Sequence, residues 1–483
     1  MKKSTWRKHH KWLGLICAFF LIMFALSGLV LNHPRLFASV NVSRSLLPAS
    51  YRYMQWNRGL LKGTLKWRRK VLIYGNNGIW MTDSTGAGLK DFNRGLPTGA
   101  DYQQIKRLCL TPQQQLFALG QYGLYRLQAD GIWHEVALQN DANERLVDMS
   151  LQGDSLVVAS RSMLFCAAPP YKQFRPITLL PPQGYDGQVS LFRLVWLLHS
   201  GELFGIVGVL VVDAIAFVLI FLSLTGVVYF FLPRMRCNKH PKVMRWLLQW
   251  HNHVGRFSIV CTLLLSFTGW LLRPPALIAI VSSRVHPLPF STMDSENAWH
   301  DKLRSLQYDA AQGDWLLYSS EGFYALKTLK STPKPEPVQP PVSVMGINVE
   351  EKDAQGRWLI GSFSGMYCWD RAQGYATDYF DGGPMQPVSG PPIGKNAVAG
   401  YSNDFKVGAL VVDYNEGTDR LPMPQWMQTL PMSLRNVALE VHTGRIYTFL
   451  SLLQVFYIFL IGLSVMWCLW SGWKLRKLSK TQS

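Results

Sequence analysis

Apolar residues are concentrated in four long runs of the chain, each bounded by polar or charged residues. A helix that crosses the hydrocarbon core of a membrane needs about 20 apolar residues at roughly 1.5 Å of rise per residue. All four runs meet this requirement, and the apolar part of the third, residues 258–272 with their flanks, is the shortest. The pattern therefore predicts a membrane α-helical bundle with four transmembrane helices, at residues 13–33, 199–232, 251–273 and 442–472.

Between the first and second helices, and between the third and fourth, the pattern changes to short β-strands. An aliphatic run, a small polar turn and an aromatic-containing run recur at residues 71–83, 116–127, 156–167, 314–326 and 357–370. Hairpins that recur about every 40 residues are typical of propeller blades. We predict that the all-β segments, residues 34–195 and 276–438, form one composite β-propeller-like domain. Two separate small β-domains are the alternative.

The net charge of +19 is concentrated in three blocks that contain no Asp or Glu, at residues 1–12, 233–250 and 473–483. Each block adjoins an apolar run, as the positive-inside rule predicts for cytoplasmic segments of a membrane protein. Both termini are then cytoplasmic, and the β-segments lie on the outer side. A nucleic-acid partner is not expected, because positive charges that lie only beside membrane helices are a poor match to a nucleic-acid-binding face.

The first apolar run also has an alternative interpretation as the apolar region of a cleaved signal peptide, because it follows a basic start. We prefer an uncleaved helix, since the run is long for a signal peptide. A repeat in the sequence also requires this segment in the mature protein.

Two motifs that contain histidine each occur twice. In the first, a His precedes the Gly of a Ser/Thr-Gly pair by 18 residues, at His10 with Ser27-Gly28 and at His251 with Thr268-Gly269. In the second, His-Ser/Thr-Gly opens a helix, at His199 and at His442. Two helical hairpins related by duplication explain both motifs.

The predicted topology places these histidines at two levels, with His10 and His251 at the inner end and His199 and His442 at the outer end. A neutral imidazole is a usual axial ligand of haem iron, and facing helices of a bundle can hold such a cofactor. A histidine at a helix end is also common as an interfacial anchor. The matching repeat positions favour a cofactor, because ligand-capable residues in membrane spans are candidates for function.

Some ligand choices stay open. His33 is a third candidate at the outer level, because 23 residues from His10 correspond to ~34 Å of helix. His251 and His253 lie about 200° apart on a helix, so only one of them can face the interior. The repeat favours His251. The sequence has no Cys-x-x-Cys-His motif, which favours two non-covalently bound haem b groups.

The external segments contain three cysteines, Cys109, Cys166 and Cys368, so at most one disulfide can form among them. Residues 331–341 contain five prolines, which predicts a stiff, extended connector.

The histidine motifs, together with Asn32-His33 and Trp250-His251, resemble those of the PepSY-associated transmembrane proteins of bacteria. The resemblance covers the four helices, and no PepSY domain is recognisable outside them. It implies an inner-membrane protein with periplasmic domains that is associated with iron uptake, where some members reduce ferric siderophores with two haems. It also implies His10 and His251 as inner ligands, and His199 and His442 as outer ligands with His33 as an alternative.

The sequence and this resemblance together predict a b-type dihaem protein that reduces a ferric chelate or siderophore on the periplasmic side. The cytoplasmic segments contain no Gly-rich nucleotide fingerprint, so the electrons would come from quinol or a membrane redox partner. No catalytic acid–base residues are expected, because the haem would supply the chemistry. The alternative is a non-enzymatic, membrane-anchored periplasmic sensor or binding protein, or an accessory subunit of metal uptake.

Overall fold

The computed structural model describes residues 2–139, 144–234, 241–386, 394 and 396–480. The chain forms two compact units. The helical unit comprises Met1–Phe37, Asp186–Ser295 and Leu434–Ser483. The β unit comprises Ala38–Tyr185 and Glu296–Ser433, so both external segments contribute to one compact body.

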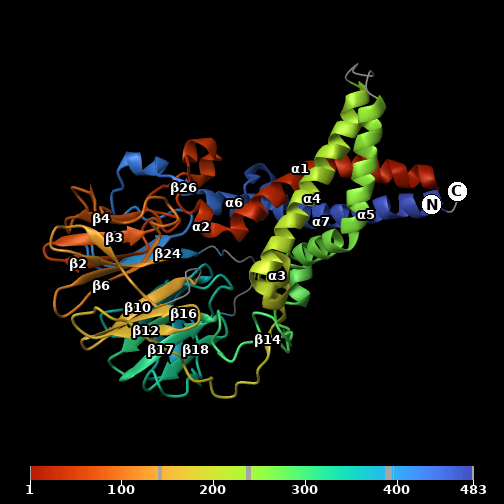
Figure 1. The fold of residues 1–483 in the computed structure, drawn as a ribbon. Helices are drawn as coiled ribbons and strands as arrows, with labels where there is room; N and C mark the ends of the chain where they lie inside the picture. The colour runs from red at the N-terminus through yellow and green to blue at the C-terminus, as the bar shows by residue number, and fades with distance from the viewer. Residues whose placement is uncertain (1, 140–143, 235–240, 387–393, 395, 481–483) are drawn as a thin grey trace. The chain divides into compact units, whose positions relative to one another are not determined.

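The helical unit contains four helices that are long and apolar enough to cross a membrane. They are α1 (Lys3–Asn32), α4 (Gly205–Phe231), α5 (Pro241–Leu271) and α7 (Gln454–Lys480). Helices α1 and α5 each pack against both α4 and α7 (Figure 1). Large apolar side chains on their outer surfaces, such as Phe257 and Val260, are mostly exposed, as lipid contact requires.

The predicted starts of the second and fourth spans need correction. His199 lies on a separate short helix, α3 (Leu191–Ser200), and His442 ends another, α6 (Leu434–His442). Gly201 then takes a left-handed backbone conformation, with φ of 83°. A Cβ atom there would lie 2.3 Å from the Gly208 carbonyl oxygen, so this turn requires glycine. The His-Ser/Thr-Gly motif is therefore a helix stop and not a helix start.

Other predicted bounds also shift. Helix α5 begins at Pro241, so much of the segment 233–250, expected as a loop, is helical, and this span is the longest of the four. Arg236 and Lys239 of that basic block lie outside the described residues. The ends of the predicted β-segments belong to the helical unit, which also contains the short helix α2 and one small sheet. Their bounds are α2 Pro34–Phe37, β14 Val189–Ser190 and β15 Arg284–Val285.

The β unit contains five four-stranded antiparallel sheets among its described residues, and the strands of each sheet follow one another in sequence order. These sheets are β2–β5 (Gly63–Trp67, Lys70–Gly75, Gly78–Thr82, Lys90–Asp91), β6–β9 (Ile105–Leu110, Leu116–Gly120, Leu124–Leu127, Trp133–Val136), β10–β13 (Leu146–Gln152, Ser155–Ser160, Leu164–Ala167, Arg175–Ile177), β16–β19 (Leu303–Asp309, Asp314–Ser319, Gly322–Leu326, Lys334–Pro335) and β20–β23 (Ile347–Lys352, Trp358–Ser362, Gly365–Asp370, Tyr375–Asp378). Each predicted hairpin forms the two middle strands of one sheet.

Other strands lie outside the predicted hairpins. Strands β24 (Val398–Ser402) and β25 (Leu410–Asp413) form a two-stranded sheet, and β1 (Asn41–Val42) pairs with β26 (Met432–Ser433). The proline-rich stretch is not only a connector, because β19 within it forms the edge of a sheet. Proline is tolerated there because an edge strand needs no complete hydrogen-bond ladder.

The aliphatic runs of the hairpins are explained by burial on both sheet faces. In β7, Phe117 and Leu119 pack toward the β10–β13 sheet, whereas Leu116 and Ala118 pack toward β2–β5. A strand that is covered on both faces reads as a continuous apolar run and not as an alternating one. The same division recurs in β3, β11, β17 and β21.

These hydrophobic clusters connect the sheets in sequence order. Successive clusters join β2–β5 to β6–β9, then to β10–β13, β16–β19, β20–β23 and β24–β25. A further cluster joins β24–β25 back to the first sheet, through Leu410 and Val412 against Val71 and Ile73. The first and last sheets of the chain are thus neighbours.

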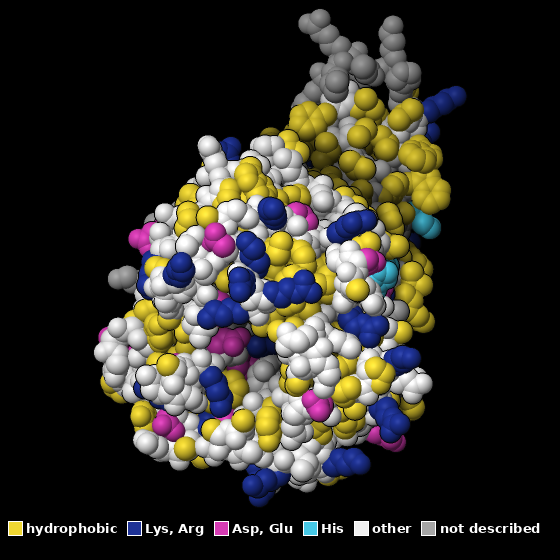
Figure 2. All heavy atoms as spheres, turned by 90° about the vertical axis from the view of Figure 1, so that its left-hand side faces the viewer, with side chains coloured by type: hydrophobic (Ala, Val, Ile, Leu, Met, Phe, Trp, Pro, Cys, Tyr) yellow, Lys and Arg dark blue, Asp and Glu magenta, His cyan; other side chains and the backbone are white. Residues whose placement is uncertain are grey.

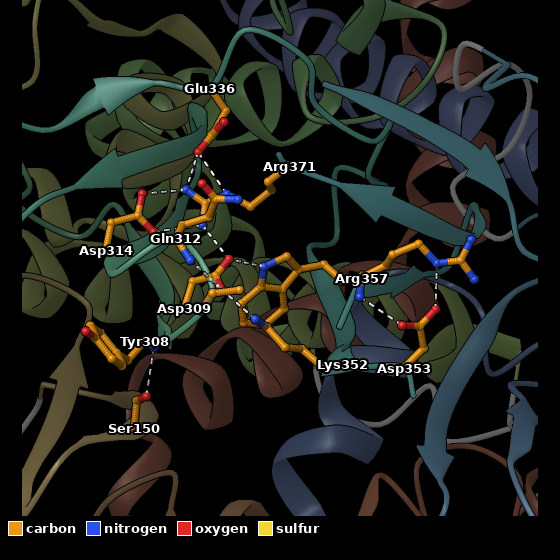
Figure 3. A network of polar contacts seen from close by, with 12 residues as sticks. Ser150, Tyr308, Asp309, Gln312, Asp314, Glu336, Lys352, Asp353, Arg357 and Arg371 are labelled. Carbon is orange, nitrogen blue, oxygen red and sulfur yellow. Dashed lines mark hydrogen bonds and ion pairs between the residues drawn. The ribbon is translucent and has the colours of Figure 1, made fainter. Parts of the chain in front are cut away.

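Charged side chains make additional links between the sheets. The Arg107 guanidinium on β6 donates to Asp148 on β10 at 2.7 Å and to Glu351 on β20 at 2.9 Å. Around Asp309, Figure 3 shows Arg371, Lys352, Asp314 and Glu336 in one network between the fourth and fifth sheets. Arg371 is buried, and each of its acidic partners is largely buried too, so this network is not a surface ion pair.

The cysteines of the β unit are free thiols. Burial raises the pKa of Cys109 to about 12 and raises the pKa values of Cys166 and Cys368 as well. A thiol that stays protonated is a poor nucleophile, so these cysteines act as small apolar side chains.

Glu350 on β20 is a buried carboxyl group that should make the stability of the β unit depend on pH. It is 4% exposed, and neither carboxyl oxygen has a hydrogen-bond partner among the described residues. Burial raises its pKa from 4.5 to about 8, and the nearby Asp148 carboxylate adds to the shift. The folded protein therefore holds a proton that the unfolded chain releases above pH 4.5. The stability of the β unit should fall as the pH rises from about 5 to 8, by roughly 1.4 kcal/mol per unit of pKa shift.

Replacing Glu350 by Gln should remove this slope and stabilise the β unit most at pH 8. The measurement is the denaturant dependence of tryptophan fluorescence at several pH values. The same change at exposed Glu416 is the control and should leave the slope in place. A slope unchanged in Glu350→Gln would show that Glu350 is ionised in the fold.

Candidate functional site

The helical unit brings four histidines together as two pairs. The ring centroids of His10 on α1 and His251 on α5 are 6.1 Å apart, with 74° between the ring planes. The ring centroids of His199 on α3 and His442 on α6 are also 6.1 Å apart, at 54°. Each ring is partly buried. Along α1, 17 residues separate His10 from Ser27, which contacts His442, so the pairs lie about 25 Å apart along the helix axis.

Every ring in these pairs is fixed through its Nδ1 atom by a neighbouring helix. A hydroxyl group lies within hydrogen-bonding distance of each Nδ1: Ser471 at 3.3 Å from His10, Thr225 at 2.9 Å from His251, Thr268 at 3.1 Å from His199 and Ser27 at 3.0 Å from His442. Backbone carbonyls also accept from three of the rings: Cys468 from His10, Leu265 from His199 and Phe24 from His442.

These contacts determine the tautomer of each ring. A carbonyl oxygen can only accept, so Nδ1 of His10, His199 and His442 must carry the proton. The Thr225 hydroxyl already donates to the Phe221 carbonyl at 2.7 Å, so it accepts from His251 in turn. All four rings therefore have a lone pair on Nε2, which has no hydrogen-bond partner in the described part of the chain. This is the arrangement that orients an imidazole for metal coordination.

Each hydroxyl residue is followed by a glycine that lies against the same ring. A Cβ atom at Gly269 would lie 2.7 Å from His199 Cε1, and one at Gly472 would lie 2.9 Å from His10 Cε1. At Gly28 and Gly226 the distance to the facing Cε1 would be 3.6 Å. The Ser/Thr-Gly pair thus provides both a hydrogen bond and room for the ring.

The contacts cross between the two halves of the repeat. Histidines of the first half, His10 and His199, are held by α7 and α5 of the second half. Histidines of the second half, His251 and His442, are held by α4 and α1 of the first half. The helical hairpins are therefore joined at the histidines themselves.

The other predicted ligands lie elsewhere. His33 Nε2 is 2.6 Å from an oxygen of Asp213, whose other oxygen accepts from Asn32. Asp213 is the only acidic residue in α1, α4, α5 and α7, and it is buried. His253 is exposed and packs on the Trp250 ring, so the structure pairs His251 and not His253 with His10.

Sequence reasoning missed two of the four Ser/Thr-Gly pairs, Thr225-Gly226 and Ser471-Gly472, as well as Asp213. The signal was present, because one such pair occurs in each long helix. No group of three or more His, Cys, Asp or Glu residues that could hold a metal ion occurs among the described residues.

The glycines give a matched test of this geometry. Gly→Ala in a helix usually stabilises it by about 1 kcal/mol. Gly226→Ala should follow this rule, since its Cβ meets His251 at ordinary contact distance. Gly269→Ala should instead destabilise the helical unit by roughly 1–3 kcal/mol, because the His199 ring must move and lose its hydrogen bonds. Unfolding in mixed detergent micelles, followed by far-ultraviolet circular dichroism, measures both. Equal effects of the two substitutions would contradict the close packing at Gly269.

Comparisons with known proteins agree with the membrane character of the chain. A family model described as the PepSY-associated TM region matches residues 1–230 and 126–475. No curated protein matches the chain.

Several solved structures are similar at low identity. One is the extracellular domain of a putative hybrid two-component system from B. thetaiotaomicron, with 9% identity and a TM-score of 0.35, covering 76% of this chain and 38% of that chain. Another is PorZ, a surface component of the type-IX secretion system of Porphyromonas gingivalis, with 10% identity and a TM-score of 0.29, covering 75% and 38%. The chain spans less than two fifths of the length of these structures.

Proposed function

The chain belongs to the PepSY-associated transmembrane family, and on this basis we propose that it is a b-type dihaem protein of the bacterial inner membrane. It carries electrons across the membrane and reduces a ferric chelate or siderophore on the periplasmic side. The observation that carries the proposal is the pairing of four imidazoles at two levels. Each imidazole has an unprotonated Nε2 with a free lone pair.

The spacing of each pair fits one haem iron. A metal–nitrogen bond is about 2 Å long, and an imidazole centre lies about 1 Å beyond its nitrogen, so two axial rings on one iron have centroids roughly 6 Å apart. The observed separation is 6.1 Å in both pairs. His10 and His251 would hold the inner haem, and His199 and His442 the outer one.

The number of ligands also favours haem over a bare ion. Each level offers two histidines, whereas structural zinc takes four protein ligands and catalytic zinc three. A porphyrin supplies the remaining four positions on the iron itself. Two imidazoles per level are therefore sufficient for haem and too few for zinc.

The chain's own residues would hold and orient the cofactors. Haem supplies reversible one-electron transfer when it is bound. Ser27, Thr225, Thr268 and Ser471 keep each imidazole in its coordinating tautomer and fix the ring plane. The glycines next to them leave room for the edge of each ring at Cε1.

We further propose that the five four-stranded sheets and β24–β25 are the blades of a composite β-propeller, which receives the ferric substrate. The hydrophobic clusters that join each sheet to the next, and the last to the first, support this arrangement. Figure 2 shows a hollow on one face of the β unit, with acidic side chains inside it and Lys and Arg side chains around it. Quinol or a membrane redox partner would donate the electrons.

The proposal predicts about two haems per chain and a Soret band in the protein purified in detergent. His199→Ala and His442→Ala should each remove one haem, and His10→Ala and His251→Ala should each remove the other. Haem content by the pyridine haemochrome method and the redox titration of the remaining haem measure this. His253→Ala is the matched control, since it lies two residues from His251 and outside the pair.

A wild-type protein without a Soret band would overturn the dihaem proposal. It would favour a membrane-anchored sensor, a binding protein or an accessory subunit of metal uptake. Loss of haem in His253→Ala and not in His251→Ala would instead overturn only the choice of the inner ligand.

A further inference from the structure

Arg273 lies at the outer histidine pair. Helix α5 ends at Leu271, but its last turn continues, with Leu272 N donating to the Thr268 carbonyl at 3.2 Å. Arg273 therefore follows Gly269 by one turn, on the same side of the helix as the glycine that contacts His199. Its guanidinium Nη2 atom donates to the His442 carbonyl at 3.3 Å. Arg273 thus contacts the backbone of His442 and lies one turn from the glycine that packs against His199.

The charge of Arg273 has no anionic partner among the described residues. The neighbouring cation, Arg445, is already paired with Glu440 through two hydrogen bonds, of 2.6 and 3.1 Å. The nearby Tyr457 hydroxyl is neutral and donates to the Gly444 carbonyl.

Removing an unpaired positive charge from water costs free energy. Arg273 is only partly exposed and adjoins apolar membrane helices. A charge that is removed from water needs a partner with matching charge and hydrogen-bonding groups. A guanidinium favours a carboxylate or phosphate, which it can bind through two parallel hydrogen bonds.

We propose that Arg273 binds a carboxylate of the cofactor at the outer level, a propionate of the haem held by His199 and His442. This inference rests on the proposed dihaem function. Arg273 makes no bond to iron and acts as a positioning residue. It anchors the haem edge, and its positive charge stabilises the reduced form of the outer haem. A phosphate of a lipid headgroup offers the same anionic chemistry, so the experiment must separate these two sources.

The test compares Arg273→Gln and Arg273→Lys with Arg445→Gln as the matched control, in protein purified with haem. The first readout is the rate at which haem transfers to apomyoglobin, and the second is the redox titration of the two haems. Arg273→Gln should release one haem about tenfold faster, as expected for the loss of a charged hydrogen bond. It should also lower the midpoint potential of one haem. Arg273→Lys should restore the potential, because it keeps the charge. Arg445→Gln should change both readouts less than Arg273→Gln does.

The outcomes separate this inference from the proposed function. Wild-type protein without haem would overturn both. Haem that is present, but unchanged in release rate and potential by Arg273→Gln, would overturn only the role of Arg273. Each measurement is repeated in lipid-free detergent and in nanodiscs with anionic lipid. An effect of Arg273→Gln that appears only in the nanodiscs would assign Arg273 to a lipid phosphate and overturn the propionate contact.

Discussion

The helical unit depends on one interaction, the hydrogen bond from each histidine Nδ1 to a helix of the other half of the repeat. A single bond of this kind stabilises a protein by only about 1 kcal/mol. Its larger effect is on geometry, because it fixes the tautomer and the ring plane. Every histidine is held by the opposite half of the repeat. Neither half alone can therefore form a histidine pair with its hydrogen bonds. Both histidine pairs therefore need all four long helices.

The Ser/Thr-Gly pairs are poor helix formers and lie within long helices because they hold the histidine rings. Glycine in a helix interior costs about 1 kcal/mol relative to alanine, and serine and threonine are also weak helix formers. In a membrane helix the hydroxyl can donate to its own backbone, as Ser27 does to the Met23 carbonyl at 2.6 Å. That donation leaves the oxygen free to accept from His442. The same hydroxyl thus donates a hydrogen bond to its own helix backbone and accepts one from the histidine ring.

Much of this architecture could be predicted from the sequence, because the strongest physical constraints leave regular patterns. Burial on both sheet faces produced the five aliphatic runs, and each became the middle hairpin of a sheet. The sixth sheet was missed because β24 contains the small residues Ala399 and Gly400 and is separated from β25 by a long turn. Its sequence therefore has no long aliphatic run, although its two strands still pack against both the fifth sheet and the first.

The candidate site was only partly predictable, for a related reason. The histidines stood out because they are rare in membrane helices. Their partners did not, because a Ser-Gly or Thr-Gly pair is common in any sequence. The short helices α3 and α6 were read as the starts of the long helices, because apolar residues resume within a few positions of His199 and His442. The left-handed glycines after His199 and His442 end the short helices, and the 3-10 turns Glu202–Phe204 and Thr448–Leu453 precede the long ones. Such turns depend on the three-dimensional close approach of the chain.

The two halves match in how they hold the rings and differ in charge next to the pair of His199 and His442. One turn beyond Gly269 lies Arg273, whereas the equivalent position beyond Gly28 is Asn32, a neutral amide that donates to Asp213 at 3.1 Å. Ring geometry is thus the part of the repeat that duplication preserved, and the charge around it is the part that diverged. If both levels carry haem, their ligands are alike, so a difference in potential between them must come from these surrounding groups. The direction of electron flow would then be set by the residues one turn away from the ligands, and not by the ligands themselves.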